Sequence, residues 1–238
     1  MTDARYYYPY SKYLKNKYGE KVYKLPVNLP AGCPNRIYGQ GCSFCAASGT
    51  GFEAADSSVP VKEQLETVRN HIAEKYHAYK YIAYFQNYTN TFLPLDQFES
   101  FLLEAAGIDG IVEIAVSTRP DCISSAYLEV LDRIRREYGL QITVELGLQT
   151  ANYHTLRSIG RGHTLAEFLD AVLQIRPFGF DICTHVILNL PGGDRTDVVE
   201  TAKILSALSV STVKLHSLYI AKNTRLCEEF LNGTITLC

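Results

Sequence analysis

The chain has 238 residues, 47% hydrophobic and 20% charged, and its 23 basic and 25 acidic residues leave a formal net charge of −2. This length and composition fit one globular domain and exclude a disordered or fibrous chain. No apolar run approaches the roughly 20 residues that a membrane-spanning helix needs, and no secretory signal begins the sequence, so we expect no membrane association and a cytoplasmic location.

Residues 1–20 form a basic, tyrosine-rich arm. Residues 1–24 hold six Lys or Arg against two acidic residues, together with seven of the 17 tyrosines. Basic and aromatic side chains together suit a nucleic-acid backbone and its bases. The alternative is an amphipathic arm whose tyrosines pack on the body of the protein, and we favour it because charge and tyrosine content alone are weak signals.

From residue 21 onward, short β-branched or aromatic runs alternate with longer stretches of helical periodicity. This alternation is typical of a parallel sheet with connecting helices. The expected strands span residues 22–29, 81–85, 111–117, 141–148, 181–190 and 212–220. The expected helices span residues 61–79, 95–106, 124–138, 165–175 and 194–208.

The alternating pattern predicts an α/β fold in one domain over residues 21–238. Such strands close into a barrel or form an open doubly wound sheet, and in both cases ligands bind at the carboxyl ends of the strands. The pattern contains no helix that caps the sixth strand, so we expect a shortened C-terminus.

Three of the seven cysteines lie in one glycine-rich loop, AGCPNRIYGQGCSFCAA, at the exit of the first strand. Cys33, Cys42 and Cys45 have the spacing C-x8-C-x2-C, and thiolates select zinc or iron–sulfur clusters. A structural zinc needs a fourth ligand, and none lies nearby in the sequence. The loop therefore favours a [4Fe-4S] cluster with one open iron. The other four cysteines are scattered, which argues against a disulfide framework.

The cysteine loop resembles that of the radical SAM superfamily, whose usual spacing is C-x3-C-x2-C. The first gap here is five residues longer. The phrases AGCPNR, YFQNYTNTF, STRPDCI, VELGLQT, LRSIGRGH and HVILNLPGG are similar to those of an uncharacterised, mainly bacterial subfamily. That subfamily is related to the Elongator catalytic subunit and to oxygen-independent coproporphyrinogen oxidase. The resemblance covers roughly residues 10–225 and implies a partial (β/α)6 TIM-like barrel.

The resemblance implies that Cys33, Cys42 and Cys45 bind three irons, while S-adenosylmethionine chelates the fourth. Phe44 would lie beside the adenine. The other residues that the resemblance brings to S-adenosylmethionine are Tyr88, Thr89, Ser117, Gln149, Arg161, His185 and Ile187. Among them, an amide at Gln149 suits the ribose diol, and a guanidinium at Arg161 suits the carboxylate.

For several other polar residues, the sequence fits more than one role. Arg119 and Asp121 fit either the cofactor or an ion pair that fixes their loop. Glu145 and His185 lie on expected strands, where charge is uncommon unless it faces a barrel lumen. A histidine on a strand, such as His185, is more often a core residue than a catalytic one. His216, on the sixth expected strand, is named only as a candidate substrate contact.

The implied reaction is reductive cleavage of S-adenosylmethionine to a 5′-deoxyadenosyl radical, which abstracts hydrogen from an unidentified substrate. A flavodoxin- or ferredoxin-like protein would donate the electron. Kinship with the Elongator catalytic subunit, which acts on transfer RNA, and the basic arm make a tRNA nucleoside one candidate substrate. Two other classes stay open, namely a zinc-stabilised binding module and a non-catalytic iron–sulfur electron-transfer protein.

Overall fold

The computed structural model describes residues 7–46 and 54–236. The helices are α1 (Tyr10–Tyr18), α2 (Pro34–Ile37), α3 (Val61–Tyr76), α4 (Leu95–Ala106), α5 (Ser125–Tyr138), α6 (Tyr153–Ser158), α7 (Leu165–Ile175), α8 (Arg195–Ala207) and α9 (Arg225–Leu231). The strands are β1 (Val22–Val27), β2 (Lys80–Phe85), β3 (Ile111–Thr118), β4 (Gln141–Gln149), β5 (Asp181–Leu188) and β6 (Thr212–Ser217). Short 3-10 turns lie at η1 (Asn90–Phe92), η2 (Pro120–Cys122) and η3 (Arg176–Phe178).

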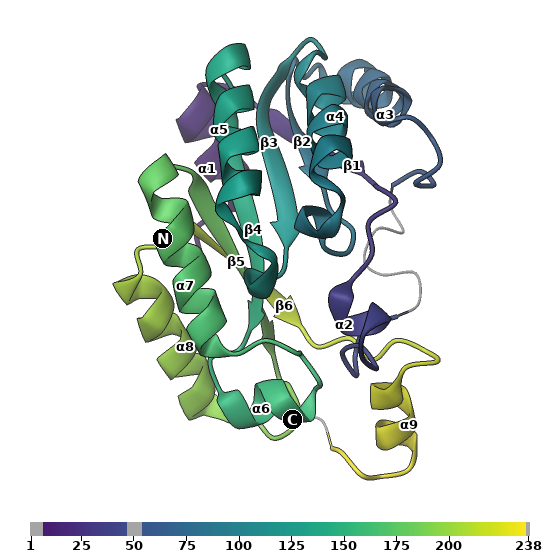
Figure 1. The fold of residues 1–238 in the computed structure, drawn as a ribbon, viewed down its shortest axis with the longest axis vertical. Coiled ribbons are helices and arrows are strands. Elements are labelled where there is room, and N and C mark those ends of the chain that lie inside the picture. The colour runs from purple at the N-terminus through teal and green to yellow at the C-terminus, as the bar shows by residue number, and fades with distance from the viewer. Residues whose placement is uncertain (1–6, 47–53, 237–238) are drawn as a thin grey trace, which may run out of the picture.

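The six strands form one parallel sheet in the order β1-β2-β3-β4-β5-β6. The sheet curls into a half-barrel that stays open between β1 and β6 (Figure 1). Each crossover helix lies on the outer face of the sheet. The expected partial TIM-like α/β barrel is thereby confirmed, and its six strands lie where the sequence pattern placed them.

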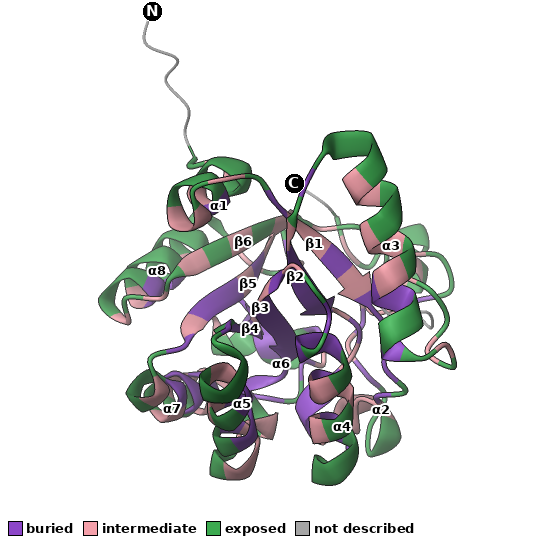
Figure 2. Ribbon diagram, turned by 90° about the horizontal axis from the view of Figure 1, so that it is seen from above, coloured by how far each residue is buried: buried purple, intermediate pink, exposed green. Residues whose placement is uncertain are grey.

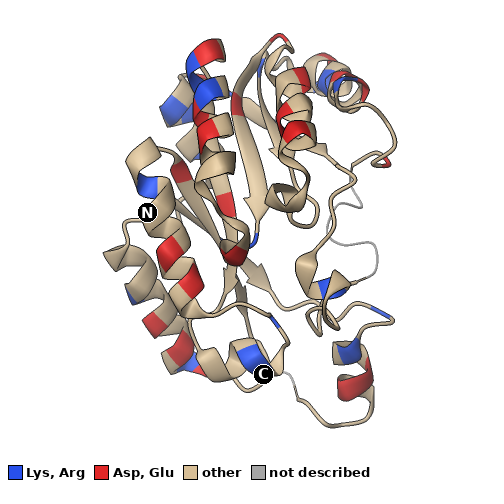
Figure 3. Cartoon of the chain, viewed as in Figure 1, with Lys and Arg blue, Asp and Glu red and all other residues tan. Residues whose placement is uncertain are grey.

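The core lies between the outer face of the sheet and the crossover helices. Figure 2 looks along the strands and shows β2 to β5 largely buried, with helices around them whose outer faces are exposed, whereas β6 is partly exposed. Phe98 on α4, Ile134 on α5 and Phe168 on α7 are fully buried against the sheet. The same helices carry charged residues (Figure 3), none of which is buried. This split follows from the helical periodicity of the apolar residues.

Local side-chain contacts fix where three of the helices begin. The Asn152 side chain accepts backbone hydrogen bonds at the start of α6. Thr164 and Glu167 form a capping box on α7, as do Asp194 and Asp197 on α8. These caps satisfy the free N–H groups of the first helical turn. They hold the loops that leave β4 and β5 in fixed positions.

Helix α1 packs across the amino-terminal ends of the strands. Leu14 is buried there in a small cluster that includes Ile82 and Tyr84. Lys17 Nζ lies 2.9 Å from Glu113 Oε2 and 2.7 Å from Asp181 Oδ2. The described part of the basic arm therefore packs on the body of the protein, whereas residues 1–6 of the expected arm lie outside the described residues.

The structure corrects several expected boundaries. The helix expected over residues 61–79 ends at Tyr76, because His77 adopts a left-handed conformation with φ 51°. The first, fifth and sixth strands are two to three residues shorter than expected. The expectation that no helix follows the sixth strand is wrong, because α9 follows β6 with Thr224 as its N-cap.

No helix in the described ranges is long and apolar enough to cross a bilayer.

Candidate functional site

A pocket opens at the carboxyl ends of the strands, the end at which parallel sheets of this kind bind ligands. It is lined by ten of the eleven predicted site residues, namely Cys33, Cys42, Phe44, Cys45, Tyr88, Thr89, Ser117, Gln149, Arg161 and His185. Ile187 does not line it. It lies on β5 in register with His216, and its expected contact with S-adenosylmethionine, which the resemblance implies on the adenine side, stays a prediction. The fold thus gathers residues from five strand exits.

The cysteine loop leaves β1 and wraps the mouth of this pocket. Cys33 precedes the single turn of α2, and the Arg36 guanidinium from that turn donates to the carbonyls of Cys45 and Ala46 at 2.8 and 2.5 Å. The backbone N–H of Ser43 donates to the Ile159 carbonyl at 2.8 Å. These contacts tie the loop to itself and to the segment after α6.

The three thiols lie together at the mouth of one pocket. Cys33, Cys42 and Cys45 all line it, and all three come from the loop that follows β1. Thiolates of this kind bind zinc or iron–sulfur clusters. Three of them in one loop could hold a cluster in which each sulfur binds a different iron.

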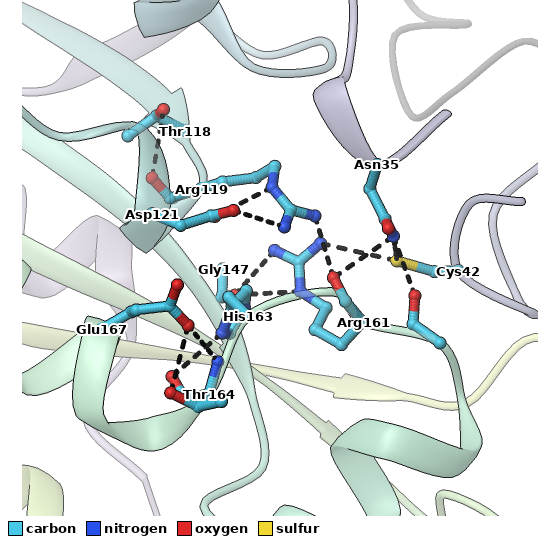
Figure 4. Close-up of polar contacts among 11 residues, drawn as sticks. Asn35, Cys42, Thr118, Arg119, Asp121, Gly147, Arg161, His163, Thr164 and Glu167 are labelled. Atoms are coloured by element: carbon cyan, nitrogen blue, oxygen red, sulfur yellow. Dashed lines mark hydrogen bonds and ion pairs between the residues drawn. The ribbon is translucent and has the colours of Figure 1, made fainter. Parts of the chain in front are cut away.

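Two N–H donors point at the sulfur of Cys42. Asn35 Nδ2 lies 3.4 Å from Cys42 Sγ, and Arg161 Nη1 lies 3.5 Å from it (Figure 4). Asn35 also donates to the carbonyls of Gly160 and Arg161. Burial raises the pKa of Cys45, and the nearby Arg36 opposes that rise. Both donors therefore face the sulfur atom that would bind iron.

The exits of β2 and β3 are joined beneath the cysteine loop. Tyr88 has a left-handed backbone with φ 54°, and the Thr89 N–H donates to the Gly32 carbonyl at 3.2 Å. The buried Asn90 amide donates to the carbonyls of Phe85 and Ser117 at 2.9 and 2.8 Å. The segment therefore presents Tyr88 and Thr89 to the pocket in a fixed conformation.

Arg119 and Asp121 form the loop-fixing pair that was one of their two expected roles. Arg119 Nε and Nη2 donate to the two carboxylate oxygens of Asp121 at 2.9 and 2.7 Å. Arg119 Nη1 donates to the Arg161 carbonyl at 2.9 Å. Arg119 therefore supports the loop that carries Arg161 (Figure 4).

Arg161 and His163 converge on one carbonyl, that of Gly147 in β4. Arg161 donates to it through Nε at 3.3 Å and Nη2 at 2.7 Å, and His163 Nε2 lies 2.9 Å from it. A Cβ on Gly147 would lie 2.6 Å from Arg161 Nη2, so only glycine permits this approach. Burial, aided by the charge of Arg161, lowers the pKa of His163 to about 3.

Sequence reasoning missed the role of His163, although the phrase IGRGH contained it. Asn35 and Arg36 follow Cys33 in CPNR and were missed likewise. In each phrase the available signal was a polar residue two positions after a residue predicted to bind the cluster or the cofactor, namely Asn35 after Cys33 and His163 after Arg161.

Gln149 and His185 occupy different depths of the pocket. Gln149 ends β4 with φ 77°, next to an irregularity in its pairing with β5. His185 Nε2 lies deeper in the lumen, 2.6 Å from Glu145 Oε2, and Lys24 binds the other oxygen of Glu145. Burial raises the pKa of Glu145, but the hydrogen bond from His185 and the charge of Lys24 outweigh it and lower that pKa. Glu145 is therefore an anion.

The lumen also holds Lys214, which was not predicted from the sequence, and His216, the candidate substrate contact. Lys214 Nζ lies 3.3 Å from the hydroxyl of Tyr84, and the ring of His216 lies 5.2 Å from that of His185. Burial, together with His185 and Lys214, lowers the pKa of His216 to about 4, so it is neutral at pH 7. Alternating polar residues in VKLHS were the signal that β6 faces this lumen.

Residues 27–205 match the sequence model of the radical SAM superfamily. An uncharacterised protein of Bacillus subtilis, YtqA, is 33% identical over 98% of this chain and 73% of its own length. A tRNA-2-methylthio-N(6)-dimethylallyladenosine synthase of Campylobacter concisus is 25% identical over 82% of this chain and 44% of its own length.

Two solved structures share the fold. Archaeal Elp3 from Methanocaldococcus infernus has a TM-score of 0.66 at 16% identity, over 91% of this chain and 50% of that one. Coproporphyrinogen III oxidase (HemN) from Escherichia coli has a TM-score of 0.56 at 16% identity, over 93% of this chain and 55% of that one. The chain spans about half the length of each.

Proposed function

The chain belongs to the radical SAM superfamily and is an enzyme of that kind, and from this premise we propose that it uses a [4Fe-4S] cluster to cleave S-adenosylmethionine reductively. The observation that carries the proposal is the three-cysteine loop at the mouth of the pocket, which it lines together with residues from the other strands. When bound, the two groups supply a 5′-deoxyadenosyl radical that abstracts hydrogen from the substrate.

The residues of this chain have separate tasks in that reaction. Cys33, Cys42 and Cys45 would hold the cluster, and the N–H donors of Asn35 and Arg161 would stabilise the Cys42 thiolate. Hydrogen bonds to a thiolate lower the energy of its charged form.

The remaining predicted residues would bind S-adenosylmethionine. Arg161, which lines the pocket, would pair with the methionine carboxylate. Gln149 would bind the ribose hydroxyls, and Phe44 would pack on the adenine. Tyr88 and Thr89 would receive the methionine amino group, and Ser117 would also contact the cofactor. His185 would lie near the ribose, and Ile187 would contact the adenine although it does not line the pocket.

The partners are part of the proposal. A flavodoxin- or ferredoxin-like donor would supply the electron, and the cytoplasm would keep the cysteine thiols reduced. A tRNA nucleoside is the candidate substrate that the name of the Campylobacter concisus relative supports. The basic arm adds little support, because Lys17 contacts Glu113 and Asp181 at the other end of the sheet.

The test of the cleavage reaction is anaerobic reconstitution with iron and sulfide, reduction with dithionite, and chromatography for 5′-deoxyadenosine after addition of S-adenosylmethionine. We expect product from the native chain and from Cys227→Ala, a cysteine on α9, and none from Cys42→Ala. Bound iron and sulfide without 5′-deoxyadenosine would favour an electron-transfer protein. Zinc in place of iron would favour a binding module.

The tRNA proposal has its own test. Binding of total tRNA is measured by filter retention at several salt concentrations, for the native chain and for a variant with Lys12 and Lys15 replaced by Ala. If the arm binds RNA, the variant has a shallower salt dependence. An unchanged slope would remove the arm from the proposal, and no retention at low salt would remove tRNA.

A further inference from the structure

The half-barrel lumen contains two layers of charged side chains with opposite charge balance. The layer under α1 has Lys17 between Glu113 and Asp181, which is one cation for two carboxylates. The layer next to the pocket has Lys24 and Lys214 around Glu145, which is two cations for one carboxylate. The positive excess therefore lies at the pocket.

The single carboxylate of the pocket layer is bound by two other side chains. Lys24 Nζ binds Oε1 of Glu145, and His185 Nε2 lies 2.6 Å from Oε2. Lys214 Nζ instead lies 3.3 Å from the Tyr84 hydroxyl and 5.2 Å from the centre of its ring. Both are weak, neutral partners for an ammonium group. Over residues 7–46 and 54–236, no carboxylate lies within 4.0 Å of Lys214 Nζ.

His216 offers a second donor beside Lys214. The two residues alternate on β6 with Ser217 and Leu215, so their side chains share the face that lines the pocket. Within the described ranges, His216 makes no side-chain hydrogen bond, and its nearest ring is that of His185 at 5.2 Å. A neutral imidazole still carries one N–H that can donate.

We propose, resting on the proposed function, that Lys214 and His216 form an anion-binding end of the substrate pocket and hold a carboxylate or phosphate group of the substrate. An ammonium ion and an N–H donor suit either group. Arg161 lines the same pocket from the cysteine-loop side, so the pocket has two separate cationic ends. One suits the carboxylate of S-adenosylmethionine and the other an anionic group of the substrate.

A metal ion is a poorer occupant of this lumen. Glu145, Cys183 and His185 have ligand atoms within 4.8 Å of one another. Both oxygens of Glu145 already accept N–H donors, and a cation placed there would be repelled by Lys24 and Lys214. The positive excess therefore selects an anion.

The test uses the reconstituted protein with saturating S-adenosylmethionine, so that the Arg161 end is occupied. Sodium acetate and inorganic phosphate are titrated separately, with sodium chloride holding the ionic strength constant, and the unfolding midpoint is measured. We expect one of the two to raise the midpoint saturably, which identifies carboxylate or phosphate as the group recognised. Lys214→Met should raise the half-saturating concentration at least tenfold.

Two further variants are controls for this titration. Lys214→Arg keeps the charge and should stay within threefold of the native chain. Lys203→Met, a change on the exposed face of α8, should leave the titration unchanged. An equal response in Lys214→Met, or no saturable response of the native chain to either anion, would overturn the proposal. Assaying 5′-deoxyadenosine on the same native preparation tests the proposed function separately.

Discussion

The two ends of the half-barrel use similar side chains for different purposes. At the amino-terminal end, α1 closes the lumen, and Glu113 accepts from Lys17, Tyr18 and Thr143. At the carboxyl end, the pocket contains three thiols and the ammonium group of Lys214, which contacts the hydroxyl and the ring of Tyr84. In proteins, buried charges are generally paired where they support the fold, and departures from this pairing occur mainly at functional sites. The difference therefore separates the structural end from the reactive one.

The largest effect is expected where the two ends meet, at Glu145. Glu145→Gln leaves Lys24 without its anionic partner, so we expect the free energy of unfolding to fall by about 3 kcal/mol. Urea denaturation followed by circular dichroism measures it. Glu200→Gln, which breaks an exposed pair with Lys203, should cost no more than about 0.5 kcal/mol. Equal losses in the two variants would show that the lumen pair is no stronger than a surface pair.

A smaller loss is expected at the closed end. Lys17→Met leaves the largely buried Glu113 without its cation, and we expect about 2 kcal/mol of destabilisation and faster amide exchange in α1. Lys15→Met, on the same helix, is the control. The comparison between the ends predicts that Lys17→Met leaves the affinity for S-adenosylmethionine unchanged. A weaker affinity would mean that the closed end also serves the site.

At the carboxyl end of the strands, Arg161→Lys tests the recognition of S-adenosylmethionine and not the stability of the fold. Lysine cannot reproduce the forked contact with Gly147 and the cofactor carboxylate, so we expect the Kd for S-adenosylmethionine to rise about tenfold, or about 1.4 kcal/mol. Equilibrium dialysis with labelled S-adenosylmethionine measures it. Arg157→Lys, on the exposed face of α6, should bind like the native chain. A native Kd in Arg161→Lys would reassign Arg161 to a structural role.

The smallest effect concerns pH. Burial, aided by Arg161, lowers the folded-state pKa of His163 to about 3, whereas the unfolded chain protonates near pH 6.5. Stability from His163 is thus present above pH 6.5 and lost as the pH falls toward 3. When the pH is lowered from 7 to 5.5, the free energy of unfolding of His163→Gln should fall by about 1 kcal/mol less than that of the native chain. Denaturant unfolding at the two pH values measures this difference. His154→Gln, at an exposed position, should follow the native chain, and parallel curves for all three would contradict the argument.

The sequence was most informative where chemistry or periodicity is local. The cysteines lie within 13 residues, and the β-branched runs mark each strand directly. Arg161 was found through a phrase shared with a family. The short helix α9 was missed because its seven residues are too few for a clear apolar period.

Contacts between distant residues could not be predicted in the same way. The pairing of Lys17 with Asp181 spans 164 positions, and that of Lys214 with Tyr84 spans 130. Strand alternation indicates which side chains share a face, but it does not say which charges meet across a curved sheet. The charge balance of the lumen is therefore visible only in three dimensions.

The strand order has a consequence for how the chain acquires its shape. Every strand pairs with the strand that precedes or follows it, so each new βα unit can add to an edge already formed as the ribosome releases it. Helix α1 is the exception, because its ion pair with Asp181 cannot form until β5 has been made. The packing of α1 is therefore complete only once β5 is in place, and this ion pair closes a loop of more than 160 residues.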